Sequence, residues 1–233
     1  PALSAAAAVK NRKELQDKIN YSLRLCFLIS LPCAVGLGVL STPIYDMLKF
    51  RGGAFIMAYG SVVLVFLAVM QIQSTILQGI GKLYIATLFS IIGIIFKIVV
   101  NYILIAMPGI NISGAIIGSI VGYMVPVILN QRVINKTLKC RVKLYKHALK
   151  PFVSALFMGI MVFVTYELLH GVAVLLGNNY FLRSIVTAAA IISGAYYYMI
   201  GLTLTHGIRA NDLNMIPGRL RKFLPKFIIR KIL

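Results

Sequence analysis

Six long apolar stretches constrain the fold of this chain more than any other feature of its sequence. They occupy residues 22–44, 54–78, 83–107, 112–130, 151–169 and 181–205. A membrane-spanning helix needs about 20 apolar residues, because each residue advances it by about 1.5 Å across a hydrocarbon core of about 30 Å. The runs are continuous rather than alternating, which excludes the strands of a membrane β-barrel. The sequence therefore predicts an all-α, polytopic membrane helical bundle with six transmembrane helices.

The composition agrees with this class. Hydrophobic residues make up 60% of the chain and charged residues only 12%, whereas a soluble domain has about 25% charged residues. A chain with so few charges cannot cover itself with a water-facing surface. We therefore expect an integral membrane protein.

The basic residues test the helix count, since lysine and arginine are retained in short cytoplasmic loops. If Arg24, at the start of the first stretch, is counted with the segment before it, then the segments before the first stretch, after the second and fourth, and after the sixth carry 20 of the 24 basic residues. The alternate connections carry only Lys49, Arg51 and, at the start of the sixth stretch, Arg183, while Lys97 lies near the middle of a stretch. This alternation predicts six spans with both ends of the chain in the cytoplasm. The net charge of +19 then reflects topology and does not indicate a nucleic-acid partner.

The same pattern predicts the domain organisation. We expect a cytoplasmic linker (1–21), four transmembrane helices (22–130), a basic cytoplasmic loop (131–150), two more transmembrane helices (151–205) and a basic amphipathic cytoplasmic tail (206–233). Basic segments beside a membrane favour anionic lipids, so the loop and the tail are predicted to contact them. The opening PALSAAAAVKNRKELQ has no charged-then-apolar signal pattern. We expect the chain to be cut from a longer protein.

The residues that common enzymes require are scarce. The chain has five carboxylates, and they are scattered over loops and helix ends, so no acid and base pair can be proposed. Glu167 and His170 form one Glu-x-x-His motif, whereas a di-metal bundle site needs two such motifs and further carboxylates. The sequence predicts no enzyme, no metal site and no cofactor.

The polar residues inside the spans are the candidate site. Ala86, Ser90, Gly93, Lys97 and Asn101 recur at helical spacing and form one small and polar stripe. A lysine at the centre of a bilayer costs about 2.5–3.5 kcal/mol on insertion scales, so it needs a compensating helix or a use. We predict that this stripe faces a water-filled substrate cavity. The alternative is a lysine whose stem reaches the interface.

Other spans carry weaker signals. In the second span, the candidate cavity residues Gln71, Ser74 and Gln78 share a face, although glutamine and serine also act as interhelical glue at about 0.6 kcal/mol each. Candidates for helix packing and bending are Gly114, Gly118 and Gly122 in the fourth span, with Pro32 and Gly36 in the first. The glycines repeat every four residues, which lets a neighbouring backbone approach closely. Proline removes a helical hydrogen bond, so the first span is expected to bend.

Several strings in order resemble one family. They are PALSAAAA, LISLPCAVGLGVLSTPIYDML, QIQSTILQGIGK, FKIVVNYILI followed by PGINISGAIIGS, and NDLNMIPGRLRKFL. Together they look like bacterial polysaccharide-exporting flippases of the stage V sporulation protein B type, which are related to the lipid II flippase MurJ. That family lies in the MOP superfamily, which also contains the MATE exporters. The resemblance covers essentially the whole chain.

This resemblance implies a fold of two helical lobes around a central cavity, followed by two additional helices. The chain would then be the last four helices of the second lobe and the two additional ones, and the remaining N-terminal helices would be its partner. It also implies transport of a lipid-linked polyprenyl-pyrophosphate saccharide, for cell-envelope or spore-wall polysaccharide synthesis, across the bacterial cell membrane. Lys97 would neutralise the diphosphate, with Asn101 and Gln71 binding sugar or phosphate. A MATE-like exporter of small cationic drugs and a non-transporting scaffold are the alternatives.

Overall fold

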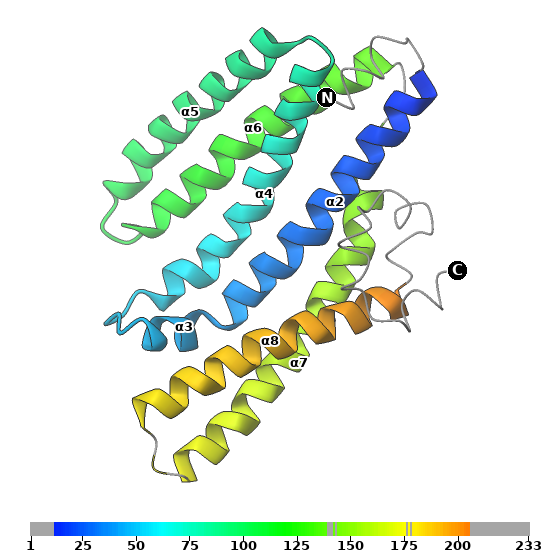
Figure 1. Cartoon of the computed structure of the whole chain (residues 1–233). Coiled ribbons are helices and arrows are strands. Elements are labelled where there is room, and N and C mark those ends of the chain that lie inside the picture. The colour runs from blue at the N-terminus through cyan, green and yellow to red at the C-terminus, as the bar shows by residue number, and fades with distance from the viewer. Residues whose placement is uncertain (1–11, 139–141, 143, 176, 178, 206–233) are drawn as a thin grey trace.

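The computed structural model describes residues 12–138, 142, 144–175, 177 and 179–205 of the chain. The predicted tail and the first half of the predicted linker lie outside the described residues. The regular elements of the described part are helices: α2 (Arg12–Val39), α3 (Ser41–Met47), α4 (Ala54–Gly79), α5 (Leu83–Ile105), α6 (Ser113–Leu138), α7 (Leu144–Leu175) and α8 (Tyr180–Leu204) (Figure 1).

Six of these helices, α2 and α4 to α8, are long and apolar enough to cross a membrane. This confirms the predicted polytopic helical bundle. The bounds of α4 and α5 differ from the predicted spans by at most two residues. Continuous apolar runs that end at Gly79 and near Pro108 leave little ambiguity about where these two helices stop.

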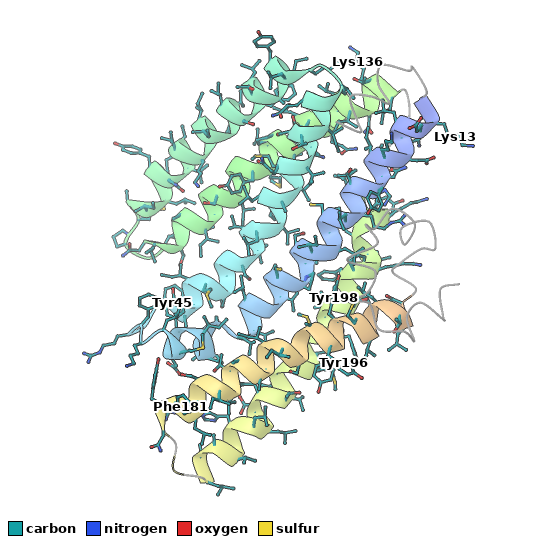
Figure 2. All side chains as sticks on the ribbon, viewed as in Figure 1. Lys13, Tyr45, Lys136, Phe181, Tyr196 and Tyr198 are labelled. Atoms are coloured by element: carbon teal, nitrogen blue, oxygen red, sulfur yellow. The ribbon has the colours of Figure 1, made fainter. Side chains whose placement is uncertain are left out.

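The helices pack in a row that does not follow their order in the chain. α5 packs on α6, α6 on α4, α4 on α2, α2 on α7 and α7 on α8, so that α5 lies at one edge (Figure 1). The start of α2 and the end of α6 lie at one end of the bundle, here called the basic end, where Lys13 and Lys136 project (Figure 2). The other end, called the α3 end, holds α3, the end of α7 and the start of α8.

Two apolar clusters hold the row together. The larger joins α2, α4, α7 and α8 through buried side chains such as Phe27, Leu31, Val69, Met158 and Val162. The smaller lies toward the basic end, between α2, α4 and α6, and includes Ile19, Leu23, Ile76, Leu77 and Ile134. Many other large apolar side chains remain exposed, above all on α5 and α7. Such outward apolar surface suits contact with lipid.

Most of the segment 131–150, which was predicted as a basic cytoplasmic loop, is helical. α6 continues to Leu138 and α7 already begins at Leu144. Likewise, α2 begins at Arg12, inside the predicted linker. Polar residues mark the point where a helix leaves the membrane, and without glycine or proline they do not end it.

The first span is interrupted after Pro32 and Gly36 rather than at them. α2 continues through Pro32 and Gly36 to Val39, and the chain breaks only at Leu40, before the short helix α3. The reason for the continuity lies on α8. Proline has no N–H, so the carbonyl of Leu28, one turn earlier, loses its helical donor.

The hydroxyl of Tyr198 on α8 donates a hydrogen bond to that carbonyl of Leu28, over 2.7 Å. Tyr198 is only 8% exposed. In hydrocarbon no water can bond a free carbonyl, so a side chain must do so. The proline of α2 is therefore matched by a tyrosine 166 positions later, and the pair joins α2 to α8.

We predict that Tyr198→Phe lowers the free energy of unfolding of the full-length protein by about 1–3 kcal/mol, the cost of one buried unsatisfied group. In a Pro32→Ala background the same change should cost less, because the alanine N–H can then bond the Leu28 carbonyl. Unfolding in detergent micelles titrated with a denaturing detergent measures all four proteins of this cycle.

Tyr196→Phe is the matched control, because the Tyr196 side chain projects from the opposite side of α8 and is 59% exposed (Figure 2). It should change stability little. Equal losses from Tyr198→Phe in both backgrounds would contradict the pairing of Tyr198 with the carbonyl freed by Pro32.

Candidate functional site

The candidate site lies where α5 meets α6, and this contact depends on glycine. A Cβ atom added at Gly122 would lie 2.6 Å from Cβ of Lys97 and 3.1 Å from the carbonyl oxygen of Gly93. One added at Gly114 would lie 2.8 Å from Cβ of Leu104. Real Cβ atoms essentially never make contacts under 3.0 Å, so the two backbones approach each other only because these residues lack side chains. The predicted glycine repeat of α6 thus packs on the predicted polar stripe of α5.

Lys97 is half-buried in this contact. Its Cβ rests on Gly122, and its ammonium lies 5.3 Å from the ring centroid of Tyr123, within the range of a cation–π interaction. By helical rise it is about 21 Å from Leu83 and about 12 Å from Ile105 along α5. Within the described part of the chain, no ion pair joins it to a carboxylate.

Asn101 follows Lys97 by one turn on α5, and its side chain also points at α6. Its Oδ1 atom is buried and accepts no hydrogen bond from the described residues. A Cβ added at Gly118 would collide with this oxygen, so one Cα–H of the glycine is directed at it. Such a Cα–H···O contact is weaker than a conventional hydrogen bond. Lys97 and Asn101 thus place a cation that has no carboxylate partner among the described residues one helical turn from an unsatisfied acceptor.

The other predicted cavity residues, on α5 and α4, differ in burial and in hydrogen bonding. Ser90 is half-buried on α5, and its hydroxyl donates to the carbonyl of Ala86 in the same helix. On α4, Gln71 and Gln78 are exposed. Ser74 is buried instead and accepts a hydrogen bond of 3.3 Å from Asn130 of α6. The face predicted on the second span is thus divided between the surface and the α4–α6 contact.

Sequence reasoning missed a buried amide network at the basic end. Gln73 is fully buried, and its Nε2 donates to Oε1 of Gln131 on α6, over 2.8 Å. Gln131 Nε2 donates to the Val142 carbonyl, and the Val142 N–H donates to Oδ1 of Asn135. These amides link α4 and α6 to the chain just before α7. The signal was the polar QRVIN run after the fourth span, which resembles an ordinary loop.

Pro32 and Gly36 line an apolar groove. The groove has a volume of about 450 Å³ and is lined from α2, α7 and α8 by residues that include Met158, Val162 and Gly194. Small residues on α2 and α8 leave this space open. With so few polar atoms it can hold a hydrocarbon chain but not a charged head group.

These features define the class: a multi-pass membrane protein with a half-buried cation and amide on one span. Among the described residues, no group of three or more His, Cys, Asp and Glu side chains could hold a metal ion. The arrangement can attract an anion and donate hydrogen bonds. It offers no general acid and base pair for covalent chemistry.

The chain is similar to the lipid II flippase MurJ of Bacillus subtilis (strain 168). The two are 27% identical over 230 residues, which cover 95% of this chain and 42% of that protein. The chain therefore spans less than half the length of the curated relative that it matches. No protein-family model matches the chain.

We predict that Gly122→Ala destabilises the full-length protein by about 1–3 kcal/mol, because an added methyl group forces the backbones of α5 and α6 apart. Unfolding in detergent micelles measures this loss. Gly171→Ala is the matched control, since nothing lies within 4 Å of a Cβ added there on α7. It should be neutral or stabilising by up to about 1 kcal/mol. If both substitutions behaved alike, the close α5–α6 approach would be contradicted.

Proposed function

We propose that the chain is part of a flippase for a lipid-linked, pyrophosphate-bearing saccharide used in cell-envelope or spore-wall polysaccharide synthesis. Two observations support the proposal. The chain is similar over almost its whole length to a protein named as a lipid II flippase. It also holds a cation inside a span with no carboxylate partner among the described residues.

The lysine carries the proposal because its surroundings leave it undercompensated. An ammonium within a span costs about 2.5–3.5 kcal/mol. The cation–π interaction with the Tyr123 ring stabilises the ammonium by about 0.5–2 kcal/mol. An anionic ligand can offset the remainder, and a diphosphate is the part of a polyprenyl-pyrophosphate saccharide that carries negative charge. A cationic drug would instead be repelled by Lys97.

The proposed mechanism is alternating access. The head group moves through a polar cavity between this chain and the remaining helices of the longer protein, while the polyprenyl tail stays in the hydrocarbon. Lys97 neutralises the diphosphate, and Asn101 and the exposed Gln71 bind sugar or phosphate oxygens. Gln78 and Ser90 add polar surface, whereas Ser74, bonded to Asn130, serves packing. Because α5 and α6 touch through glycines, they move as one unit.

We further propose that the basic end faces the cytoplasm of a bacterial cell, with both ends of the chain there. The helical extensions beyond the spans support this orientation, since they carry the exposed residues Arg132, Lys136 and Lys146. Basic groups at the cytoplasmic surface attract anionic lipids by about 1 kcal/mol each. The same attraction is proposed for the tail.

Replacing Lys97 tests this function. In proteoliposomes of the full-length protein, Lys97→Met should lower the rate of transport of a lipid-linked diphosphate saccharide about ten- to hundredfold. This is the loss of one hydrogen bond to a charged group, about 1.5–3 kcal/mol. Lys97→Arg should retain more of the rate, because it keeps the charge. The apolar methionine should insert and fold at least as well as lysine.

Lys136→Met is the matched control, since it removes an exposed lysine outside the apolar span of α6. It should transport at the parental rate. If Lys97→Met is made in normal amounts and also transports at that rate, the lysine has no part in transport. Uptake of a cationic dye dependent on the protein, without flipping, would favour the exporter alternative instead.

A further inference from the structure

A cavity at the α3 end collects basic residues from distant parts of the chain. It has a volume of about 390 Å³ and is lined by Lys49 and Arg51, from the α3–α4 connection, and by Arg183, from the first turn of α8. These are the basic residues that the described part of the chain places at this end. Asp46 is the one carboxylate in the lining. The formal charges of the lining therefore sum to +2.

Contacts between α3 and α8 hold the basic groups together. The hydroxyl of Tyr180, at the start of α8, donates to the carbonyl of Met47 at the end of α3, over 2.5 Å. The ammonium of Lys49 lies 4.4 Å from the centroid of the Tyr180 ring. The α3–α4 connection is thus fastened to α8, although more than 130 residues separate them in the chain.

Aromatic side chains show at which depth the cavity lies. Phe50, Tyr59 and Phe181 are 58%, 68% and 74% exposed at this end of the bundle, where Figure 2 shows Phe181 and Tyr45. Tyrosines at the ends of membrane helices, such as Tyr59 here, mark the level of the lipid head groups. The phosphates of the bilayer lie at this same level.

We propose that this cavity binds the phosphate of an anionic phospholipid in the leaflet at the α3 end. Arginine offers paired N–H donors that match phosphate oxygens, and lysine adds a point charge. The hydroxyls of Tyr166 and Ser184 also line the cavity and can donate to the same group. The bound lipid would hold α3 and α8 together. This site is separate from Lys97, and its test does not depend on the proposed flippase activity.

Fluorescence quenching in the full-length protein tests the proposal. The chain contains no tryptophan, so Phe181→Trp places a reporter beside the cavity once any tryptophan elsewhere in the protein is replaced. In nanodiscs, brominated phosphatidylglycerol should reach half-maximal quenching at a mole fraction at least about fivefold lower than brominated phosphatidylcholine. Each basic group removed, by Lys49→Gln or Arg51→Gln, should weaken this preference about fivefold.

Two controls make the outcome decisive. Arg132→Gln removes the same charge at the basic end and should leave the preference unchanged, and Lys49→Arg should retain it. Equal quenching by both lipids, or an equal effect of Arg132→Gln, would overturn the site. Brominated phosphatidylglycerol should keep its quenching in millimolar inorganic phosphate, because its acyl chains also hold it in the membrane; displacement would show that the cavity prefers free phosphate and would overturn the lipid as its main ligand.

Discussion

A backbone group inside hydrocarbon has no water to bond, and the whole structure depends on this constraint. It dictates helices for all six spans, since a helix satisfies its own backbone. It also explains why Pro32 does not break α2. The carbonyl that proline leaves without a donor belongs to Leu28, and the hydroxyl of Tyr198 bonds it. The bond that replaces the missing N–H thus joins α8 to α2.

The lack of water inside the membrane also affects the polar groups of the candidate site. α5 and α6 approach so closely, through Gly118 and Gly122, that polar groups on α5 are enclosed by helix rather than by lipid. Lys97 obtains only an aromatic ring as a partner, and Oδ1 of Asn101 obtains only a glycine Cα–H. Buried polar groups are usually well satisfied. We propose that an anionic ligand supplies the partner that Lys97 lacks among the described residues, whereas Oδ1 of Asn101 is itself an acceptor and cannot bond a phosphate oxygen.

Much of the fold could be predicted from the sequence, because continuous apolar runs of about 20 residues are typical of membrane-spanning helices. The pairing of the α6 glycines with the stripe on α5 was not predicted, although both patterns were recognised separately. Periodicity finds the face of a helix but not its neighbour. Gln73 was missed for the same reason. Several polar residues lie close together along α4, and the sequence does not show that Gln73 is the one that packs against α6. The helical extensions beyond residue 131 were missed because polar residues after an apolar span were interpreted as the end of the helix.

The central claim is that Lys97 meets the charged head group of a lipid-linked substrate. The most direct measurement is a structure of the full-length protein with a lipid-linked diphosphate saccharide bound. The account predicts a phosphate oxygen within about 4 Å of the Lys97 ammonium, the reach of an ion pair, with the ammonium turned from the Tyr123 ring toward it. A head group bound elsewhere, with Lys97 still against Tyr123, would contradict the claim.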